Sequence, residues 1–174
     1  MEKKSSHNIH PIAQKVMKTP RSVDVEITSR CNLRCKYCYF FDNPEVTYRE
    51  LSTEEWLQFF DELGQCGVMD VCLVGGEPFI REDLPQLIRG IVKNRMRFSV
   101  LSNGGLIDDT IAAFIAETKR CNYVQVSVDG SSAAVHDTCR GKGSFDKAIR
   151  GIKILQKHDI PMTVRVTLHR DNIK

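Results

Sequence analysis

Long hydrophobic runs are absent from this 174-residue sequence. No stretch approaches the ~18 apolar residues that a membrane-spanning helix needs. The N-terminus also lacks an apolar segment of the ~7–15 residues found in secretory signal peptides. We therefore expect a cytoplasmic protein with no membrane partner. The net charge is only +3 at pH 7, and so small an excess gives no indication of a nucleic-acid partner.

Basic residues gather at one end of the chain. Residues 1–21 contain five Lys or Arg side chains and a single acidic one, Glu2. Such a segment is typical of a solvated, flexible tail, with a binding arm as the alternative. We predict a basic N-terminal tail over residues 1–21 and one domain over residues 22–174, which is long enough to bury a hydrophobic core.

Strand-like and helix-like segments alternate along this domain. Runs rich in β-branched residues predict strands at Val23–Thr28, Val71–Val74, Phe98–Leu101, Tyr123–Val128 and Thr163–Leu168. Amphipathic segments predict helices near Thr53–Leu63, Leu84–Asn94, Asp109–Thr118 and Phe145–Lys157. Ser52 and Glu55 have the spacing of a capping box for the first helix, and we expect Gly64 to end it. Asp83 is placed to cap the second helix.

This alternation is typical of an α/β protein with a parallel sheet covered by helices. The pattern leaves two architectures open, an open doubly wound sheet and a barrel-like sheet. In both architectures the functional loops lie at the carboxyl ends of the strands. The segments that directly follow the predicted strands are therefore the places to look for chemistry.

Three cysteines follow the first predicted strand within eight residues: Cys31, Cys35 and Cys38, with Tyr37 before the last of them. Thiolates are soft ligands, so the loop is suited to zinc or to an iron–sulfur cluster. A structural zinc site takes four protein ligands, and no further Cys or His follows until Cys66. Three thiolates on a four-iron cluster would instead leave one iron open to another ligand, an arrangement that suits chemistry better than electron storage.

Glycine-rich and polar turns follow the next strands. Gly75 and Gly76 permit a close backbone approach, and Glu77 adds a carboxylate directly after them. Short polar side chains also stand at the ends of the third and fourth strands: Ser102, Asn103, Ser127 and Asp129. Each of these segments taken alone is also an ordinary turn.

A further polar stretch runs from His136 to Gly141 and contains Arg140. A guanidinium group matches a carboxylate in a bidentate pair, so Arg140 is a candidate for binding a carboxylate. We expect His136 to cap or pack locally rather than to transfer protons.

Together these segments resemble the radical SAM superfamily over about residues 22–172. The resemblance rests on the C-x3-C-x2-C motif and on the GGEP, SNG, SVDG and HDxxRG segments. It is closest to the peptide- and cofactor-maturing, SPASM-type group, which includes enzymes of pyrroloquinoline quinone synthesis, sulfatase maturation and heme d1 synthesis. The resemblance implies a 4Fe–4S cluster on Cys31, Cys35 and Cys38, and S-adenosylmethionine bound beside it.

The resemblance also implies which residues bind S-adenosylmethionine. Its amino group is expected at Gly75, Gly76 and Glu77, and its carboxylate at Arg140. The remaining expected contacts to the cofactor are Tyr37, Ser102, Asn103, Ser127 and Asp129. Asp129 has an alternative role, which is to hold the turn at Gly130 together.

The fold implied is an incomplete parallel (β/α) partial TIM-like barrel with about five strands and four helices. The family core has six strands, whereas five are predicted here, and no SPASM region with further clustered cysteines follows. We therefore expect a chain truncated at its C-terminus, with its last strand as an unprotected edge.

The implied activity is reductive cleavage of S-adenosylmethionine to a 5′-deoxyadenosyl radical that abstracts hydrogen, in peptide or cofactor maturation. The implied partners are an electron donor such as flavodoxin or ferredoxin and a precursor peptide or protein. Two alternatives stay open: a radical SAM enzyme acting on a small-molecule precursor or RNA, and a non-catalytic iron–sulfur or zinc module. The other cysteines form no second cluster in sequence, and structural roles are expected for Cys66, Cys72, Cys121 and Cys139.

Overall fold

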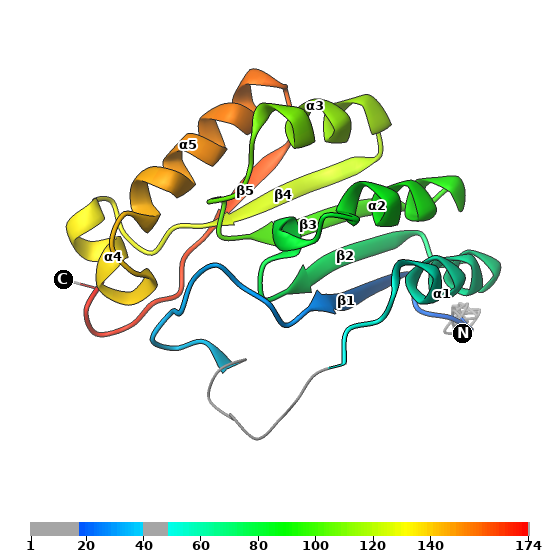
Figure 1. The fold of residues 1–174 in the computed structure, drawn as a ribbon, viewed down its shortest axis with the longest axis horizontal. Helices are drawn as coiled ribbons and strands as arrows, with labels where there is room; N and C mark the ends of the chain where they lie inside the picture. Colours follow the sequence, from blue (N-terminus) through cyan, green and yellow to red (C-terminus); the bar gives the residue numbers. More distant parts are fainter. Residues whose placement is uncertain (1–17, 40–48, 174) are drawn as a thin grey trace, which may run out of the picture.

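Five parallel strands form one sheet in this computed structural model, which describes residues 18–39 and 49–173 (Figure 1). The strands are β1 (Ser22–Thr28), β2 (Asp70–Gly75), β3 (Arg97–Ser102), β4 (Cys121–Ser127) and β5 (Met162–Arg165). They pair in the order β1-β2-β3-β4-β5, so neighbours in the chain are neighbours in the sheet. The five predicted strands are confirmed, although β5 ends at Arg165 rather than at Leu168. Most of the predicted tail, residues 1–17, lies outside the described residues.

The four predicted helices are confirmed as α1 (Thr53–Gln65), α2 (Leu84–Lys93), α3 (Asp109–Thr118) and α5 (Ser144–Lys157). The structure adds helix α4 (Ala133–Arg140) and the short 3-10 helix η2 (Pro78–Ile80), neither of which was predicted. The residues that α4 buries are His136, Cys139 and Arg140. Because two of these three are polar, α4 has no apolar stripe of helical period for a sequence pattern to detect.

The first helix begins as predicted but ends later. Glu55 N–H donates to the Ser52 hydroxyl (3.2 Å), and the Glu55 carboxylate accepts from Ser52 N–H (2.8 Å), which completes the capping box. The prediction that Gly64 ends α1 is wrong, because Gly67 is the residue in the left-handed conformation, with φ of +79°. Gly64 instead lies against Asn94, where a Cβ would come within 2.9 Å of the Asn94 Cβ.

Asp83 stands at the N-cap of α2, but its carboxylate caps no backbone amide there. Arg81 donates to both Asp83 oxygens, at 2.8 and 2.6 Å, and Thr53 donates to one at 2.6 Å. The buried Arg81 also donates to the Ile27 carbonyl (2.8 Å). The Arg81–Asp83 ion pair therefore takes the place of the expected cap, and the Arg81 bond to Ile27 joins the start of α2 to β1.

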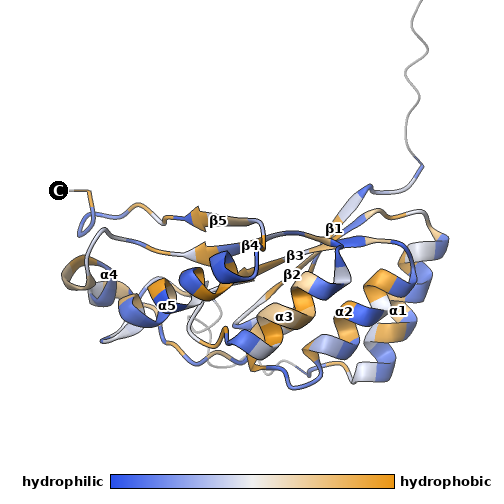
Figure 2. Ribbon diagram, turned by 90° about the horizontal axis from the view of Figure 1, so that it is seen from above, coloured by the Kyte–Doolittle hydropathy of each residue, from blue (hydrophilic) through white to orange (hydrophobic). Residues whose placement is uncertain are grey.

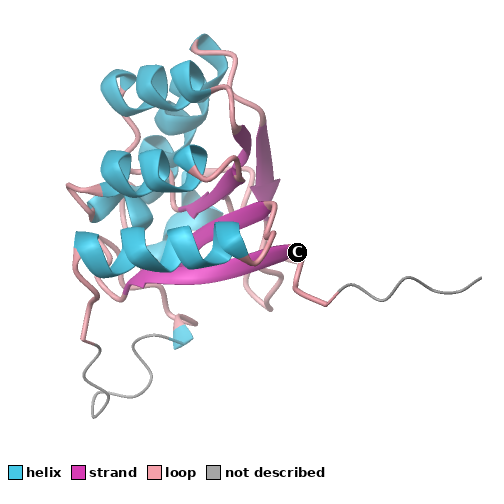
Figure 3. Cartoon of the chain, turned by 90° about the vertical axis from the view of Figure 1, so that its right-hand side faces the viewer, coloured by secondary structure: helices cyan, strands magenta, loops and turns pink. Residues whose placement is uncertain are grey.

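Helices α1, α2, α3 and α5 all lie on one face of the sheet (Figures 2 and 3). The hydrophobic core fills the space between these two layers, and its fully buried side chains include Phe60, Ile88, Phe98, Ile115 and Leu155. Burying each such side chain contributes about 1.5–3 kcal/mol. A doubly wound sheet carries helices on both faces, so this one-sided arrangement selects the partial barrel. No helix in the described ranges has the length and apolar character needed to cross a membrane.

The carboxyl ends of the strands meet at one edge of the sheet. Thr28, Gly75, Ser102 and Ser127 are the last residues of β1, β2, β3 and β4. The cysteine loop follows β1, the glycine-rich turn follows β2, and the two polar turns follow β3 and β4. The fold therefore brings to one place segments that are about a hundred residues apart in the sequence.

Candidate active site

A cavity of about 340 Å³ opens at this edge of the sheet. Ten of the twelve predicted site residues line it: Cys31, Cys35, Tyr37, Cys38, Gly75, Gly76, Ser102, Asn103, Ser127 and Arg140. The other two, Glu77 and Asp129, are buried and do not line the cavity. The sequence motifs therefore lie close together in space. The carboxylates of Glu77 and Asp129 lie behind the cavity wall and are not exposed in the cavity.

The cysteine loop is held by its own backbone and by α4. Cys38 N–H donates to the Cys35 carbonyl (3.1 Å), and Leu33 N–H donates to the Cys31 sulfur (3.4 Å). Lys36 N–H donates to the Cys139 carbonyl at the end of α4 (2.9 Å). Burial raises the pKa of the Cys31 and Cys35 thiols, with the nearby Arg140 charge opposing the rise at Cys35. A soft metal centre would displace the proton from each thiol that it binds.

The three sulfur atoms are spread more widely than a single zinc ion would hold them. The sulfurs of Cys31, Cys35 and Cys38 do not form a group whose members all lie within 4.8 Å of one another. A single zinc ion, with Zn–S bonds of about 2.3 Å in tetrahedral geometry, would hold them about 3.8 Å apart. A 4Fe–4S cluster instead takes each thiolate on a different iron, so the wider spread suits it better than a single ion.

Gly75 and Gly76 allow β2 to end directly against the segment that leads into the cysteine loop. Gly75 has φ of +137°, and a Cβ there would lie 2.3 Å from the Thr28 carbonyl oxygen. A Cβ on Gly76 would lie 2.3 Å from the Arg30 carbonyl oxygen. The Gly76 amide donates to Thr28 and the Glu77 amide to Arg30, both at 2.8 Å. The close approach expected of these glycines is real, and it is an approach to the chain's own backbone.

Glu77 connects the second loop to the third. Its fully buried carboxylate accepts hydrogen bonds from the Ser102 hydroxyl (2.8 Å), from Asn103 N–H (2.7 Å) and from Phe79 N–H (3.2 Å). Burial raises the pKa of Glu77 to about 7, against the opposing effect of these donors. The structure thus shows Glu77 shaping the loops, and its contact with the amino group of S-adenosylmethionine stays a prediction.

Asn103 connects the third loop to the cysteine loop. Its side-chain amide donates to the Asn32 side-chain oxygen (2.8 Å), and its nitrogen lies 3.8 Å from the Cys31 sulfur. Its own side-chain oxygen accepts from Gly105 N–H (2.8 Å). Asn103 therefore fixes the position of Cys31 from the opposite wall of the cavity.

Asp129 is at the centre of a buried polar network. Arg140 Nε donates to its carboxylate at 2.6 Å, and Thr167 N–H donates at 2.9 Å. The Tyr37 hydroxyl also donates to this carboxylate, and the Arg140 guanidinium lies 5.6 Å from the centre of the Tyr37 ring. Burial opposes ionisation of Asp129, but the bonds from Arg140 and Tyr37 outweigh it and lower the pKa. Burial and the Asp129 bond raise the pKa of Tyr37, which stays protonated.

This network gives Arg140 a partner within the chain. The sequence predicts Arg140 as a partner for the carboxylate of a ligand, yet in the structure it already pairs with a carboxylate of the chain. It still lines the cavity, so its predicted contact with S-adenosylmethionine stays a prediction. Asp129 ties together β4, α4 and the segment after β5 rather than the Gly130 turn alone.

His136 has the local role expected of it. Its Nδ1 accepts a hydrogen bond from Asp129 N–H (3.1 Å), and its ring packs edge-on against Phe145 with 5.6 Å between centroids. Burial lowers the pKa of His136, so the ring is neutral. It supports the backbone of the Asp129 turn.

Several residues that line the cavity were missed from sequence: Leu33, Tyr39, Val74, Leu101, Gln125, Arg165 and Thr167. Gln125 lies two residues before Ser127 on β4, so strand alternation places both on one face. That signal was present, because a polar side chain inside an apolar strand is unusual. Arg165 and Thr167 show the same spacing at the end of β5.

The remaining cysteines divide into two kinds. Cys72 and Cys121 are buried in β2 and β4, where burial raises their pKa values to about 11 and about 12. Cys66 is exposed at the end of α1. Cys139 lies in α4 and, like the strand cysteines, is buried.

The comparison with protein families agrees with this geometry. The sequence profile of the Radical SAM superfamily matches residues 25–174. The chain therefore belongs to the radical SAM superfamily, a family of enzymes that use a 4Fe–4S cluster and S-adenosylmethionine.

Among individual relatives, the Fe-coproporphyrin III synthase of Methanosarcina barkeri is 38% identical over 85% of this chain and 37% of its own length. The PqqA peptide cyclase of Granulibacter bethesdensis is 30% identical over 89% of this chain and 41% of its own. The solved structure of native anSMEcpe with bound AdoMet superposes with a TM-score of 0.73 and 25% identity, over 83% of this chain and 43% of that one. The chain thus spans about two fifths of the length of these relatives.

Proposed function

We propose that this chain is the cofactor-binding part of a radical SAM maturase that abstracts hydrogen from a peptide or from the precursor of a cofactor. The observation that supports it most directly is the cavity, which brings the three cysteines together with seven other predicted cofactor residues. When bound on Cys31, Cys35 and Cys38, the reduced cluster would supply the electron that splits S-adenosylmethionine into methionine and a 5′-deoxyadenosyl radical.

The residues of the chain would position S-adenosylmethionine and keep water away from it. The backbone of Gly75 and Gly76 lines the cavity beside the cysteine loop and would meet the amino group. Ser102 and Ser127 would offer hydroxyls to the ribose. Arg140 would place a positive charge opposite the carboxylate, and its bond to Asp129 keeps that charge in one position.

A peptide is the substrate class that we favour. One relative is named a PqqA peptide cyclase, and the motifs resemble those of peptide-maturing enzymes. An iron porphyrin is the second candidate, because the Fe-coproporphyrin III synthase shares the higher identity, 38%. In either case we propose a cytoplasmic enzyme that receives electrons from a small donor such as flavodoxin or ferredoxin.

Anaerobic reconstitution tests the proposal. The protein is loaded with iron and sulfide, the iron and sulfide per chain are counted, and dithionite and S-adenosylmethionine are then added. We expect about four irons per chain and formation of 5′-deoxyadenosine, measured by liquid chromatography with mass spectrometry. Cys35→Ala should abolish both, whereas Cys66→Ala, at an exposed position on α1, should leave both unchanged.

The possible results separate the alternatives. Iron binding without any 5′-deoxyadenosine would favour the non-catalytic iron–sulfur module. Zinc binding with no iron would reject the enzyme. Deuterium transfer into 5′-deoxyadenosine from a deuterated precursor peptide, and none from a deuterated porphyrin, would settle the substrate class in favour of peptides.

A further inference from the structure

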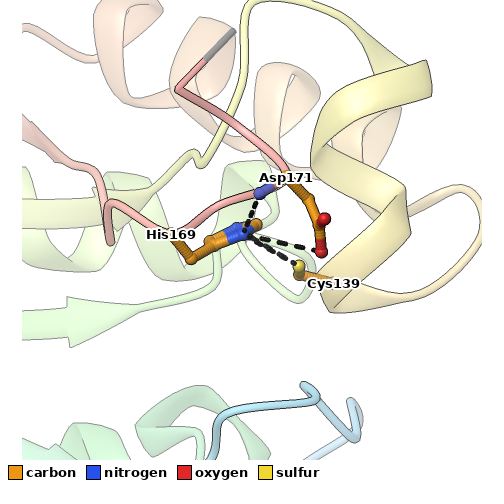
Figure 4. Close-up of side chains that lie close together, drawn as sticks. All are labelled: Cys139, His169 and Asp171. Carbon is orange, nitrogen blue, oxygen red and sulfur yellow. Dashed lines mark hydrogen bonds and ion pairs between the residues drawn. The ribbon is translucent and has the colours of Figure 1, made fainter.

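A second group of metal-ligating side chains lies outside the cysteine loop (Figure 4). Cys139 comes from α4, and His169 and Asp171 come from the segment after β5. One ligand atom from each residue lies within 4.8 Å of the other two, and no other such trio occurs among residues 18–39 and 49–173. None of the three lines the cavity of the candidate active site.

The distances within this group approach those of a metal site. The Cys139 sulfur lies 3.2 Å from His169 Nε2 and 3.7 Å from His169 Nδ1, and Nδ1 lies 4.0 Å from an Asp171 carboxylate oxygen. Tetrahedral zinc, with bonds of about 2.3 Å to sulfur and about 2.0–2.1 Å to nitrogen and oxygen, needs separations of about 3.4–3.6 Å. The separations of His169 from Cys139 and from Asp171 are thus within about 0.7 Å of those values. The imidazole must also turn, so that the lone pair of one nitrogen points at the cation.

The donor types indicate which cation would bind. A thiolate, an imidazole and a carboxylate together suit zinc and similar borderline cations, whereas Mg²⁺ and Ca²⁺ require oxygen ligands. Cys139 is 4% exposed, and the side chains of His169 and Asp171 are 20% and 63% exposed. The group is thus buried at the sulfur and open at the carboxylate, which gives a cation a path from solvent.

The backbone and side chains around the group hold the imidazole in place. Asp171 N–H donates to His169 Nδ1 (3.3 Å), a hydrogen bond that a cation on this nitrogen would replace. His169 N–H donates to the Asn172 side chain (2.8 Å), which in turn donates to the Asp129 carbonyl (2.9 Å). The His169 ring also packs on Tyr37, with 5.9 Å between centroids.

We propose that Cys139, His169 and Asp171 form a second metal site that binds one zinc-type divalent cation. Binding displaces the thiol proton of Cys139 to solvent, and the cation takes a water molecule as its fourth ligand. The site is separate from the cysteine loop and needs none of its thiols.

Such a site would fasten the segment after β5 to α4. Both of the joined parts reach the cavity, α4 through Arg140 and the segment through Thr167. The Cys139 carbonyl also accepts a hydrogen bond from Lys36 N–H. A cation here would therefore steady one wall of the cavity and the loop that carries the cluster cysteines, without taking part in the chemistry itself.

Cobalt binding tests the site independently of the iron–sulfur cluster. The full chain with Cys31, Cys35 and Cys38 all changed to Ala serves as the background, because it lacks the other thiol site. Titration with Co²⁺ should give one ion per chain and a thiolate-to-cobalt charge-transfer band, and Zn²⁺ should displace the cobalt. In this background, Cys139→Ser should remove the band, and His169→Gln should weaken Co²⁺ binding at least tenfold.

Asp171→Asn and Cys66→Ser complete the comparison. Asp171→Asn should weaken binding but keep the band, because the thiolate remains, and Cys66→Ser should change neither. A folded background that binds no stoichiometric Co²⁺ would overturn the proposal, as would a band that survives Cys139→Ser. If Cys139→Ser does not fold, His169→Gln decides: unchanged Co²⁺ affinity in that variant rejects the site.

Discussion

Gly76→Ala is the substitution for which the structure makes the sharpest prediction. A Cβ at this position would lie 2.3 Å from the Arg30 carbonyl oxygen and 2.7 Å from both the Arg30 carbonyl carbon and the Ser29 carbonyl oxygen. All three neighbours are main-chain atoms, so no side-chain rotation relieves the contact. The Ser29–Arg30 backbone must move, and that backbone leads directly into Cys31.

The cost follows from two contributions. Overpacking of a close-packed site costs about 1–3 kcal/mol. The hydrogen bonds from Gly76 N–H to Thr28 and from Glu77 N–H to Arg30, both 2.8 Å, are stretched by the same movement, and each contributes about 1 kcal/mol. We expect Gly76→Ala to lower the free energy of unfolding by about 3 kcal/mol and to displace the cluster cysteines.

Two measurements check this expectation. Urea unfolding gives the loss of stability, and iron per chain after anaerobic reconstitution reports on the cysteine loop. Gly67→Ala is the matched control, because Gly67 has a positive φ but no atom within 4 Å of an added Cβ. The control should lose about 1–2 kcal/mol from backbone strain alone and should keep its full iron content.

The reasoning fails if Gly76→Ala stays within about 0.5 kcal/mol of the unmodified chain and binds iron normally. It also fails if both glycine variants lose iron to the same extent, because the effect would then be general destabilisation. Retained stability with lost iron would place the whole movement in the cysteine loop and would still agree with the geometry.

Three further predictions concern the thiols and the buried charges. Cys35→Ala should reduce bound iron to background levels while Cys66→Ala keeps it, and equal loss in the two variants would show that the ligands are misassigned. Arg140→Ala leaves the buried carboxylate of Asp129 without an opposite charge, so urea unfolding should show a free energy of unfolding lower by about 3–5 kcal/mol. Adding Asp129→Asn should recover part of that loss, and an unchanged cost would contradict the pairing. Because the pKa of Glu77 is raised to about 7 in the folded chain, the folded state holds a proton that the unfolded state releases near pH 4.5. The contribution of Glu77 to stability should therefore fall by about 2–3 kcal/mol between pH 5 and pH 8, and Glu77→Gln should lack this part of the pH dependence.

The fold was predictable where local pattern and burial agree. Each strand is a β-branched run that packs under helices, and helices such as α2 carry an apolar face, so period alone located them. Helix α4 was not predicted because it buries polar side chains, His136 and Arg140, whose partners come from elsewhere in the chain. Hydrophobic periodicity detects apolar helix faces, and it cannot detect a helix face that is stabilised by hydrogen bonds and ion pairs.

The sequence predicted which residues gather at the site better than it predicted how these residues bond to one another. The resemblance to radical SAM enzymes, together with the carboxyl-end rule, pointed to ten residues that line the cavity. What Glu77 and Arg140 bind within the chain depends on distances between loops, which only the packed sheet sets. The trio around Cys139 was missed for the same reason, because His169 lies 30 residues further along the chain and no motif joins the two.

The strand order of the sheet has a consequence for how the protein is made. Because the strands pair in the order in which they leave the ribosome, the thiols emerge first and the far wall of their cavity last. About 136 residues separate Cys31 from Thr167, which takes roughly 7–27 s at about 5–20 residues per second of translation. During that interval the nascent thiols have no finished cavity around them and are open to oxygen. With the cluster ligands proposed above, we expect insertion to follow translation of β5, and expression in air to yield chains whose cysteines are oxidised before iron reaches them.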